Sequence, residues 1–223
     1  MIAPAPIKAP VSIRESVEQS LAALIVSGQL APGTLVSVPT LAAQFDVSAT
    51  PVREAILNLE RRGFVTAVKN KGFRITEVSD EERAHLVETR KLLEPPVIGG
   101  LAKNCPHSKL PELTAIAEEI VAGAAEGDLQ AYLEADLRFH LALLRLAGNP
   151  IVVDIVADLR SRTRLTGLLK LLASEQLDQS AREHLELLDL LEAGDSDGAQ
   201  ALMAKHIEHV RGWWAGRPED AQG

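Results

Sequence analysis

The sequence predicts a mainly α-helical protein in two parts: a small N-terminal domain of three helices and a hairpin, and a C-terminal all-α bundle of about six helices. Two observations carry this expectation. Aromatic residues make up only 3% of a chain that is 46% hydrophobic, so aliphatic side chains must fill the core, which favours helix packed on helix. Strand-like runs occur only between residues 64 and 78, and long helical patterns follow them.

The charge of the chain is divided unevenly along its 223 residues. The net charge is −8, but residues 1–76 hold eight Lys/Arg against five Asp/Glu, whereas residues 77–223 hold fifteen against twenty-six. A small basic module joined to a larger acidic one is therefore expected, and the basic module is the candidate for binding nucleic acid.

Neither a signal peptide nor a long apolar run is visible, so a cytoplasmic protein with no membrane segment is expected. The single cysteine, Cys105, excludes an internal disulfide and is interpreted as a buried, reduced thiol.

The first elements are a disordered arm over residues 1–10 and a helix from about Ser12 to Ser27 that ends at Gly28. Its apolar face comprises Ile13, Val17, Leu21, Leu24 and Ile25. The segment GQLAPGTLV follows as a loop with a Pro-Gly turn, and a second helix runs from about Pro39 to Phe45.

The stretch DVSATPVREAILNLERR, residues 46–62, predicts a turn and an amphipathic third helix. Its apolar stripe is Val52, Ala55, Ile56 and Leu59, and its outward residues are Thr50, Arg53, Asn58 and Arg61. Ser48 or Thr50 can cap the helix start, and Gly63 is a stop signal.

After Gly63, two β-rich runs over 64–68 and 73–78 flank a basic tip that contains Lys69 and Lys71. The order helix, helix, turn, helix, hairpin is that of a winged helix-turn-helix DNA-binding domain, expected over residues 11–78. In such a domain the third helix enters the major groove and the hairpin reaches a neighbouring groove.

Residues 79–216 are expected to form the all-α bundle, followed by a flexible tail over 217–223. The predicted helices begin at Ser79, Pro111, Asp128, Ile151, Ser180 and Asp195, and the last ends near Trp213 and Trp214. A kink is expected at the Pro95-Pro96 pair. The two tryptophans are interpreted as packing residues.

The chain resembles the GntR family of bacterial transcription regulators, in the FadR-like branch with an FCD effector domain. The resemblance rests on GQLAPGTL, LAAQFDVSATPVREAILNLERRGFV and KNKGFRI in the N-terminal part, and on TRKLLEPP, ADLRFHLALLRLAGNP, REHLELLDLLEAGD and MAKHI in the C-terminal part. It implies a homodimer that binds a palindromic operator, with a C-terminal domain that binds a small carboxylate metabolite.

The DNA-binding residues expected on this basis are Ser48, Thr50, Arg53, Lys69 and Lys71. Ala49 and Pro39 stand where many relatives carry basic residues. Since arginine contacts to guanine discriminate between bases, the operator sequence is expected to differ from those of relatives.

One aspartate and three histidines form a candidate metal site: Asp136, His140, His184 and His206. Asp136 and His140 are four apart and share a helix face, while the other two come from later helices. A single histidine on an apolar helix is more often a hydrogen-bonded core residue, and the resemblance is what favours a metal here, because the FCD pattern places its ligands at these four positions. Zinc or nickel suits the nitrogen-rich set, and manganese remains open.

The other histidines, His85, His107 and His209, are interpreted as surface or packing residues, with His209 the main rival ligand because it lies three residues after His206. Arg90 is the candidate effector-binding residue by the resemblance, since a guanidinium matches a carboxylate. The alternative is a surface pair with Glu94. Any of Arg160, Arg162 and Arg164 can face the pocket.

The sequence therefore indicates a DNA-binding transcription regulator, a repressor rather than an enzyme, controlled by a small carboxylate bound at a divalent metal. Two alternatives stay open: a metal-dependent enzyme acting on a small organic acid, and a bundle whose metal is purely structural.

Overall fold

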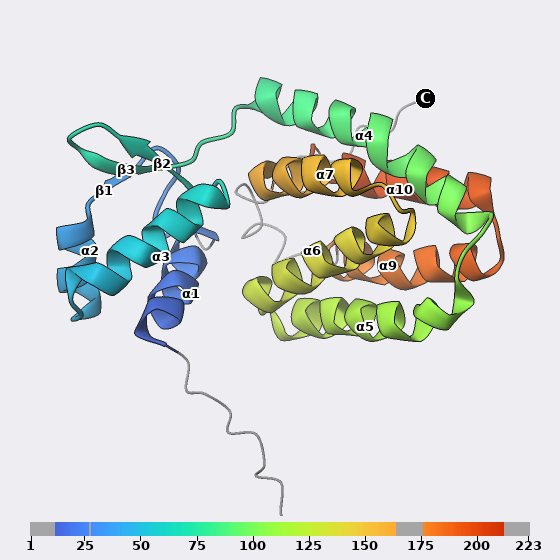
Figure 1. Cartoon of the computed structure of the whole chain (residues 1–223), viewed down its shortest axis with the longest axis horizontal. Helices are drawn as coiled ribbons and strands as arrows, with labels where there is room; N and C mark the ends of the chain where they lie inside the picture. Colours follow the sequence, from blue (N-terminus) through green and yellow to red (C-terminus); the bar gives the residue numbers. More distant parts are fainter. Residues whose placement is uncertain (1–11, 27, 164–175, 212–223) are drawn as a thin grey trace, which may run out of the picture.

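A computed structural model describes residues 12–26, 28–163 and 176–211. Three helices and a small sheet form the N-terminal domain, and a long helix leads from the sheet into an all-α bundle (Figure 1). The mainly α-helical fold class is confirmed. Within the described ranges, no helix is both long and apolar enough to span a bilayer. The predicted arm over 1–10 and tail over 217–223 lie outside the described residues.

The N-terminal helices are α1 (Ile13–Val26), α2 (Val38–Phe45) and α3 (Ala49–Arg61). The predicted stripe of α3 is confirmed, because Val52, Ala55, Ile56 and Leu59 are all 0% exposed. The Ser37 Oγ accepts a hydrogen bond from the Thr40 N–H at the start of α2. Asp46 ends α2 with φ 53°, a left-handed conformation that a short polar residue tolerates. The turn over 46–48 then leads into α3, which packs against α2.

Two predicted orientations in this domain were wrong. Ile13, assigned to the apolar face of the first helix, is 61% exposed because it occupies the first position of α1. Asn58, assigned to the outer face of the third helix, is half-buried and donates a hydrogen bond from Nδ2 to Glu18 Oε2 over 2.9 Å. Asn58 therefore joins α3 to α1.

The sheet contains β1 (Leu35–Val36), β2 (Val65–Val68) and β3 (Gly72–Ile75) in the antiparallel order β1-β3-β2. The predicted hairpin is confirmed as β2 and β3, but the loop prediction for GQLAPGTLV missed β1, which is too short to show alternation. Gly72 has φ +112°, and a Cβ there would collide with the Val36 carbonyl oxygen. Glycine thus allows β1 to approach the hairpin.

The bundle helices are α4 (Asp80–Ala102), α5 (Leu110–Glu126), α6 (Leu129–Leu146), α7 (Pro150–Thr163), α9 (Gln176–Glu192) and α10 (Ser196–Glu208), with a 3-10 turn at His107–Lys109. α4 packs along α10, and α5 packs against both α6 and α9. The fourth bundle helix is predicted from about Ile151 to Ser174, and its part beyond Thr163 lies outside the described residues, as do Trp213 and Trp214. α4 runs without a break through Pro95 and Pro96.

The bundle core is aliphatic as expected, with Tyr132 and Phe139 as its largest fully buried side chains. A separate apolar cluster lies where the two domains meet. It consists of Val78 from the connecting segment, Leu86 from α4 and Leu159 from α7. The C-terminal end of α7 therefore packs against the segment that leads out of the N-terminal domain (Figure 1).

Candidate metal centre and nucleic-acid interface

The fold brings the four predicted ligands together from three helices. Asp136 and His140 lie one turn apart on α6, His184 lies on α9 and His206 on α10, and all four are buried. One potential ligand atom from each residue lies within 4.8 Å of those from the other three. Such convergence is what a bundle core needs to hold a metal ion.

The distances between these atoms fit a coordination shell. His140 Nε2 lies 3.1 Å from His184 Nε2, which lies 3.2 Å from Asp136 Oδ1. The third distance, between His140 Nε2 and Asp136 Oδ1, is 3.4 Å. Ligand atoms that each lie about 2.1 Å from a metal are about 3.0–3.4 Å apart at octahedral or tetrahedral angles. The donor set therefore fits a divalent ion.

Hydrogen bonds outside the cluster fix the protons of two imidazoles. His184 Nδ1 donates to the Ala181 carbonyl oxygen over 3.0 Å, and His206 Nδ1 donates to Glu183 Oε2 over 2.9 Å. Carbonyl and carboxylate oxygens only accept, so both Nδ1 atoms carry protons and the neutral rings keep their lone pairs on Nε2. His140 Nδ1 is buried with no hydrogen-bond partner among the described residues.

The surroundings keep two of the imidazoles, those of His140 and His206, neutral. Burial, and after it the positive charge of Arg160, holds the pKa of His140 well below its usual value. Burial also lowers the pKa of His206 to about 4, in spite of the neighbouring Glu183 carboxylate. A histidine must be neutral to bind a metal, so these two groups are ready as ligands near pH 7.

A buried ion-pair network adjoins the cluster on its Asp136 side. Glu94 Oε1 accepts from Arg90 Nε over 2.6 Å, and Glu94 Oε2 accepts from Arg160 Nη2 over 2.7 Å. Arg160 also donates from Nη1 to Asp136 Oδ2 over 3.3 Å. Asp136 thus faces the histidines with one oxygen and Arg160 with the other. The Arg90–Glu94 pair exists, but it is buried, so its interpretation as a surface pair was wrong.

The network keeps its charges. Burial raises the pKa of Glu94, but Arg160 and Arg90 outweigh it and the pKa lies below the usual value. Burial and the charge of Arg90 lower the pKa of Arg160 to about 10, which leaves it protonated at neutral pH. The two arginines and two carboxylates balance, so a divalent ion with neutral imidazoles would add two positive charges that favour an anionic ligand.

The fold places the other arginines, histidines and the cysteine considered above in different surroundings. Arg160 faces the site, Arg162 pairs instead with Glu82 at the start of α4, and Arg164 lies outside the described residues. His85 and His107 are exposed, while His209 is 0% exposed and contacts Glu183. Cys105 is half-buried rather than fully buried.

Sequence reasoning missed the roles of two carboxylates. Glu94 was considered only as a partner of Arg90, because the pairing of α4 with α7 that brings Arg160 to it is not visible in the pattern. Glu183 was not singled out, although it directly precedes His184. Its contacts run to α10, and only the packing of α9 on α10 creates them.

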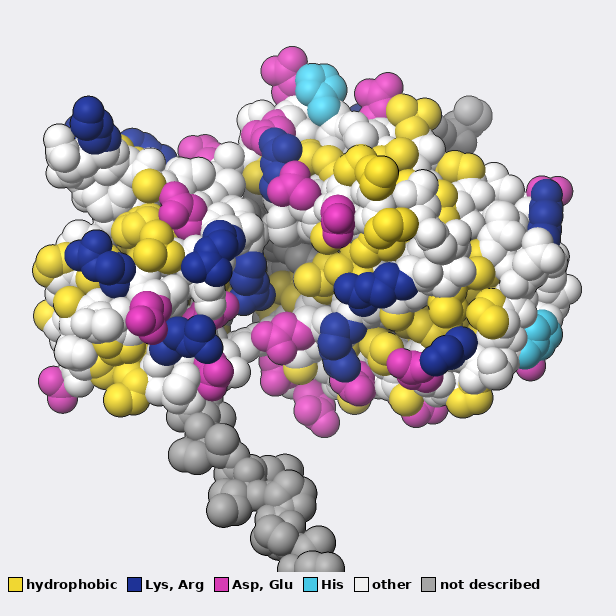
Figure 2. Space-filling model, viewed as in Figure 1, with side chains coloured by type: hydrophobic (Ala, Val, Ile, Leu, Met, Phe, Trp, Pro, Cys, Tyr) yellow, Lys and Arg dark blue, Asp and Glu magenta, His cyan; other side chains and the backbone are white. Residues whose placement is uncertain are grey.

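The residues expected to bind DNA are all exposed: Ser48, Thr50, Arg53, Lys69 and Lys71. Figure 2 shows basic side chains distributed over the visible face of the N-terminal domain. Ser48 precedes α3 without a side-chain capping bond, so its hydroxyl remains available. Ala49 is the first residue of α3 and Pro39 lies in the first turn of α2.

Comparison with known proteins gives concordant matches. Residues 13–75 match the family "Bacterial regulatory proteins, gntR family", and residues 85–209 match the FCD domain. A probable D-xylose utilization operon transcriptional repressor of Paenarthrobacter nicotinovorans is 30% identical over 82% of this chain and 80% of its own length.

The HTH-type transcriptional regulator McbR of Escherichia coli is 27% identical over 89% of this chain and 90% of its own. The solved structure of E. coli McbR/YncC superposes with a TM-score of 0.67 at 26% identity, covering 90% of this chain and 95% of that one.

Proposed function

This chain belongs to the GntR family of bacterial regulatory proteins and is a transcription regulator with an FCD domain, and we propose that it is a homodimeric repressor under metabolite control. In this proposal the dimer binds a palindromic operator through Ser48, Thr50, Arg53, Lys69 and Lys71. A small carboxylate binds at a metal centre in the bundle and changes the affinity for DNA. The name of the Paenarthrobacter relative, a repressor, supports the sign of regulation.

The observation that carries the proposal is the buried set of Asp136, His140, His184 and His206 beside a buried pair of arginines. These four residues would hold the ion, with zinc or nickel favoured by three nitrogen ligands and manganese as the alternative. The ion would supply a positive centre that binds a carboxylate oxygen. Nothing in this role requires a chemical reaction.

Arg90 is the proposed contact for the effector carboxylate. Among the described residues, Glu94 is its hydrogen-bond partner, and it uses only Nε for that bond. The two Nη groups of a guanidinium form a fork that matches the two oxygens of a carboxylate. Glu94 would therefore hold the guanidinium in place without occupying the fork.

The end of α7 offers a physical route from this site to the DNA-binding domain. Arg160 reaches Glu94 and Asp136, and the next two residues, Ser161 and Arg162, lie against Gly63 at the end of the recognition helix α3. A Cβ added to Gly63 would come within 3.5 Å of Ser161 Oγ. A shift of α7 caused by ligand binding would therefore move the residues that contact the end of α3.

Dimer formation is proposed through the bundle. Large apolar side chains exposed on it are Leu92 of α4 and Ile151 and Ile155 of α7, at 71%, 68% and 43%. Figure 2 shows apolar surface extending over the visible face of the bundle. Exposed large aliphatic residues on neighbouring helices are typical of association surfaces. Two copies would also double the phosphate contacts of one winged domain.

The test combines metal analysis, ligand screening and DNA binding on the full-length protein. Metal content is measured by elemental analysis, and melting temperature is measured with sugar acids, hydroxy acids and dicarboxylates. An acid that raises the melting temperature is then added to a fluorescence-anisotropy titration with DNA from upstream of the gene. We expect it to change the DNA affinity of the wild type but not of the His140→Ala variant.

Two outcomes would overturn parts of the proposal. A melting temperature that responds to metal but to no acid would favour a structural ion. Turnover of an acid, lost in His140→Ala, would favour an enzyme. The route through α7 has its own control: Arg162→Ala removes the contact with Glu82 but leaves the site intact, so it should preserve acid binding and weaken the effect of the acid on DNA affinity.

A further inference from the structure

Glu183 on α9 is a buried carboxylate that the proposed metal set does not include. It is 4% exposed, and it accepts hydrogen bonds from two imidazoles at the C-terminal end of α10, one inside the helix and one directly after it. His206 Nδ1 lies 2.9 Å from Oε2, and His209 Nε2 lies 2.8 Å from Oε2 and 3.0 Å from Oε1. The Lys205 ammonium lies 2.9 Å from Oε1. The Glu183 carboxylate therefore contacts three donor side chains, all from residues 205–209.

The contact with His206 determines which ring nitrogen faces the cluster. Because a carboxylate only accepts, Nδ1 of His206 carries the proton and Nε2 carries the lone pair. The His206 ring centroid lies 4.7 Å from that of His184 and 5.2 Å from that of His140. His206 is thus placed between Glu183 on one side and the histidine cluster on the other.

We propose that Glu183 is a positioning residue of the metal centre, which holds His206 in the ring orientation and tautomer that direct Nε2 at the ion. This inference rests on the proposed metal site. Histidine ligands commonly donate their second N–H to a carboxylate, which fixes the ring and strengthens the ligand. His209, by donating to the same carboxylate, keeps Glu183 in place and does not itself bind the ion.

A second metal ion bound by Glu183, His206 and His209 is the competing interpretation, since these three side chains also lie close together. The geometry argues against it. Lys205 already places a positive charge beside the Glu183 carboxylate, and the carboxylate satisfies two imidazole N–H donors. A cation there would have to displace both protons and face the ammonium.

The direct test needs no substitution. Long-range ¹H–¹⁵N NMR spectra of the full-length protein distinguish a protonated, a lone-pair and a metal-bound ring nitrogen. In zinc-loaded wild type we expect His206 to show a protonated Nδ1 and a metal-bound Nε2, and His209 to show no metal-bound nitrogen. Metal bound through Nδ1 of His206, or bound to His209, would overturn the proposal.

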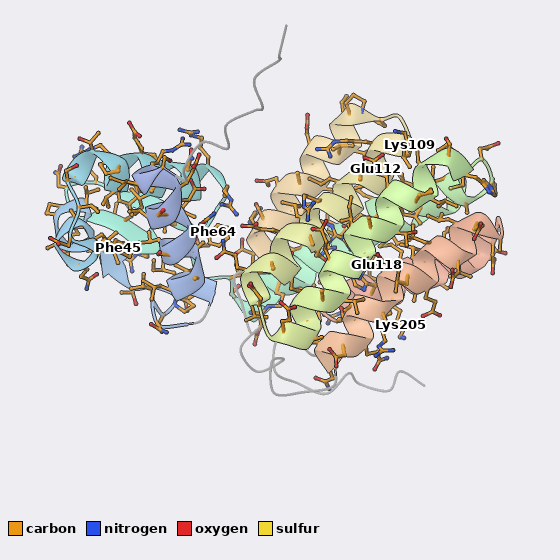
Figure 3. All side chains as sticks on the ribbon, turned by 90° about the horizontal axis from the view of Figure 1, so that it is seen from below. Phe45, Phe64, Lys109, Glu112, Glu118 and Lys205 are labelled. Atoms are coloured by element: carbon orange, nitrogen blue, oxygen red, sulfur yellow. The ribbon has the colours of Figure 1, made fainter. Side chains whose placement is uncertain are left out.

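The second test compares Glu183→Gln with Lys205→Ala. Zinc affinity is measured by competition with a chelator, and the melting temperature of each metal-free variant is measured alongside. Glu183→Gln should lower zinc affinity about 10- to 100-fold. Lys205→Ala removes a half-exposed partner of the same carboxylate, labelled on α10 in Figure 3, and should leave zinc affinity within about twofold.

Three results separate the possibilities. Unchanged zinc affinity in a folded Glu183→Gln variant contradicts the positioning role. Two zinc ions per chain, reduced to one by His209→Ala, support the second site instead. Full metal occupancy in His206→Ala would refute the metal centre itself, and with it the inference. Loss of metal from His206→Ala, together with unchanged zinc affinity in Glu183→Gln, would refute the inference alone.

Discussion

Arg160 Nη1 donates a hydrogen bond to Asp136 Oδ2 over 3.3 Å, while the other oxygen of Asp136 faces His140 and His184. This contact joins the ion-pair network to the histidine cluster. The same guanidinium donates to Glu94 from Nε and Nη2. The charge and position of Arg160 therefore affect the proposed metal ligand Asp136 directly. They also affect the proposed effector contact Arg90, because Arg90 and Arg160 share Glu94.

Replacement of Arg160 by alanine should be strongly destabilising. It would remove the guanidinium that pairs with Asp136 and leave Glu94 with only Arg90, and breaking a buried ion pair costs about 3–5 kcal/mol. The free energy of unfolding is measured by urea denaturation of the metal-free protein. Arg162→Ala is the matched control on the same helix: its ion pair is exposed, so the loss should stay below about 1 kcal/mol. Equal losses in the two variants would contradict the network.

Replacement of His184 by alanine should lower the metal content of the purified protein without unfolding the N-terminal domain, because the two parts have separate cores. His85→Ala is the control, since His85 is exposed on α4 and lies outside the cluster. Elemental analysis measures metal per chain, and DNA affinity reports the N-terminal domain. Full occupancy in His184→Ala would refute the site.

Acid should destabilise the metal-free protein. The pKa of His206 falls from 6.5 to about 4 on folding, mainly by burial, so the unfolded chain binds more protons between these values. The contribution of neutral His206 to the free energy of unfolding is therefore complete above pH 6.5 and is lost as the pH falls through this window. The pKa values of Glu94, lowered by its two arginines, and of Glu183, lowered by its two histidines, act in the same direction at lower pH.

A difference of one in pKa between the folded and unfolded states corresponds to about 1.4 kcal/mol, so a loss of a few kcal/mol is expected from His206 alone. Urea denaturation after chelator treatment, repeated across this pH range, measures it. Added zinc should reduce the loss near the upper end of the window, because an ion holds the imidazoles unprotonated. A stability that stays constant or rises with acid would contradict the prediction.

Arg53→Ala should weaken operator binding by about 1–3 kcal/mol. Arg53 is exposed on α3 and has no ion pair with another described residue, so its removal should not affect the fold. Arg138→Ala, which removes an exposed arginine of α6, is the control and should leave the affinity unchanged. Affinities are compared by fluorescence anisotropy at one salt concentration, and equal values for the two variants would exclude α3 as the recognition helix.

Ile155→Glu should weaken the dimer, because it places a charge on the exposed apolar side of α7. Analytical ultracentrifugation over a range of protein concentrations measures the association. Leu57→Glu is the control: Leu57 is a similarly exposed leucine at 38%, but it lies on α3 of the DNA-binding domain. A wild type that is monomeric, or an Ile155→Glu dimer of unchanged affinity, would rule out this surface.

Much of the fold could be predicted from the sequence because it depends on local periodicity. The stripe of α3 and the helix start at Ser79 depend on residues within a turn or two of one another, and the structure has both. The convergence of Asp136 and His140 was equally local, because residues four apart share a helix face. That His184 and His206 join them was predicted from the family resemblance rather than from spacing.

The helical class, the basic and acidic halves, and the identity of the residues with metal-ligand chemistry all follow from the order of residues in the chain. Only the tertiary structure shows that Leu35–Val36 is a strand, that Glu94 pairs with two arginines, and that Glu183 accepts a hydrogen bond from His206. The physical reason is the same in each case. These contacts join elements far apart in the chain, and packing, not periodicity, selects which faces meet.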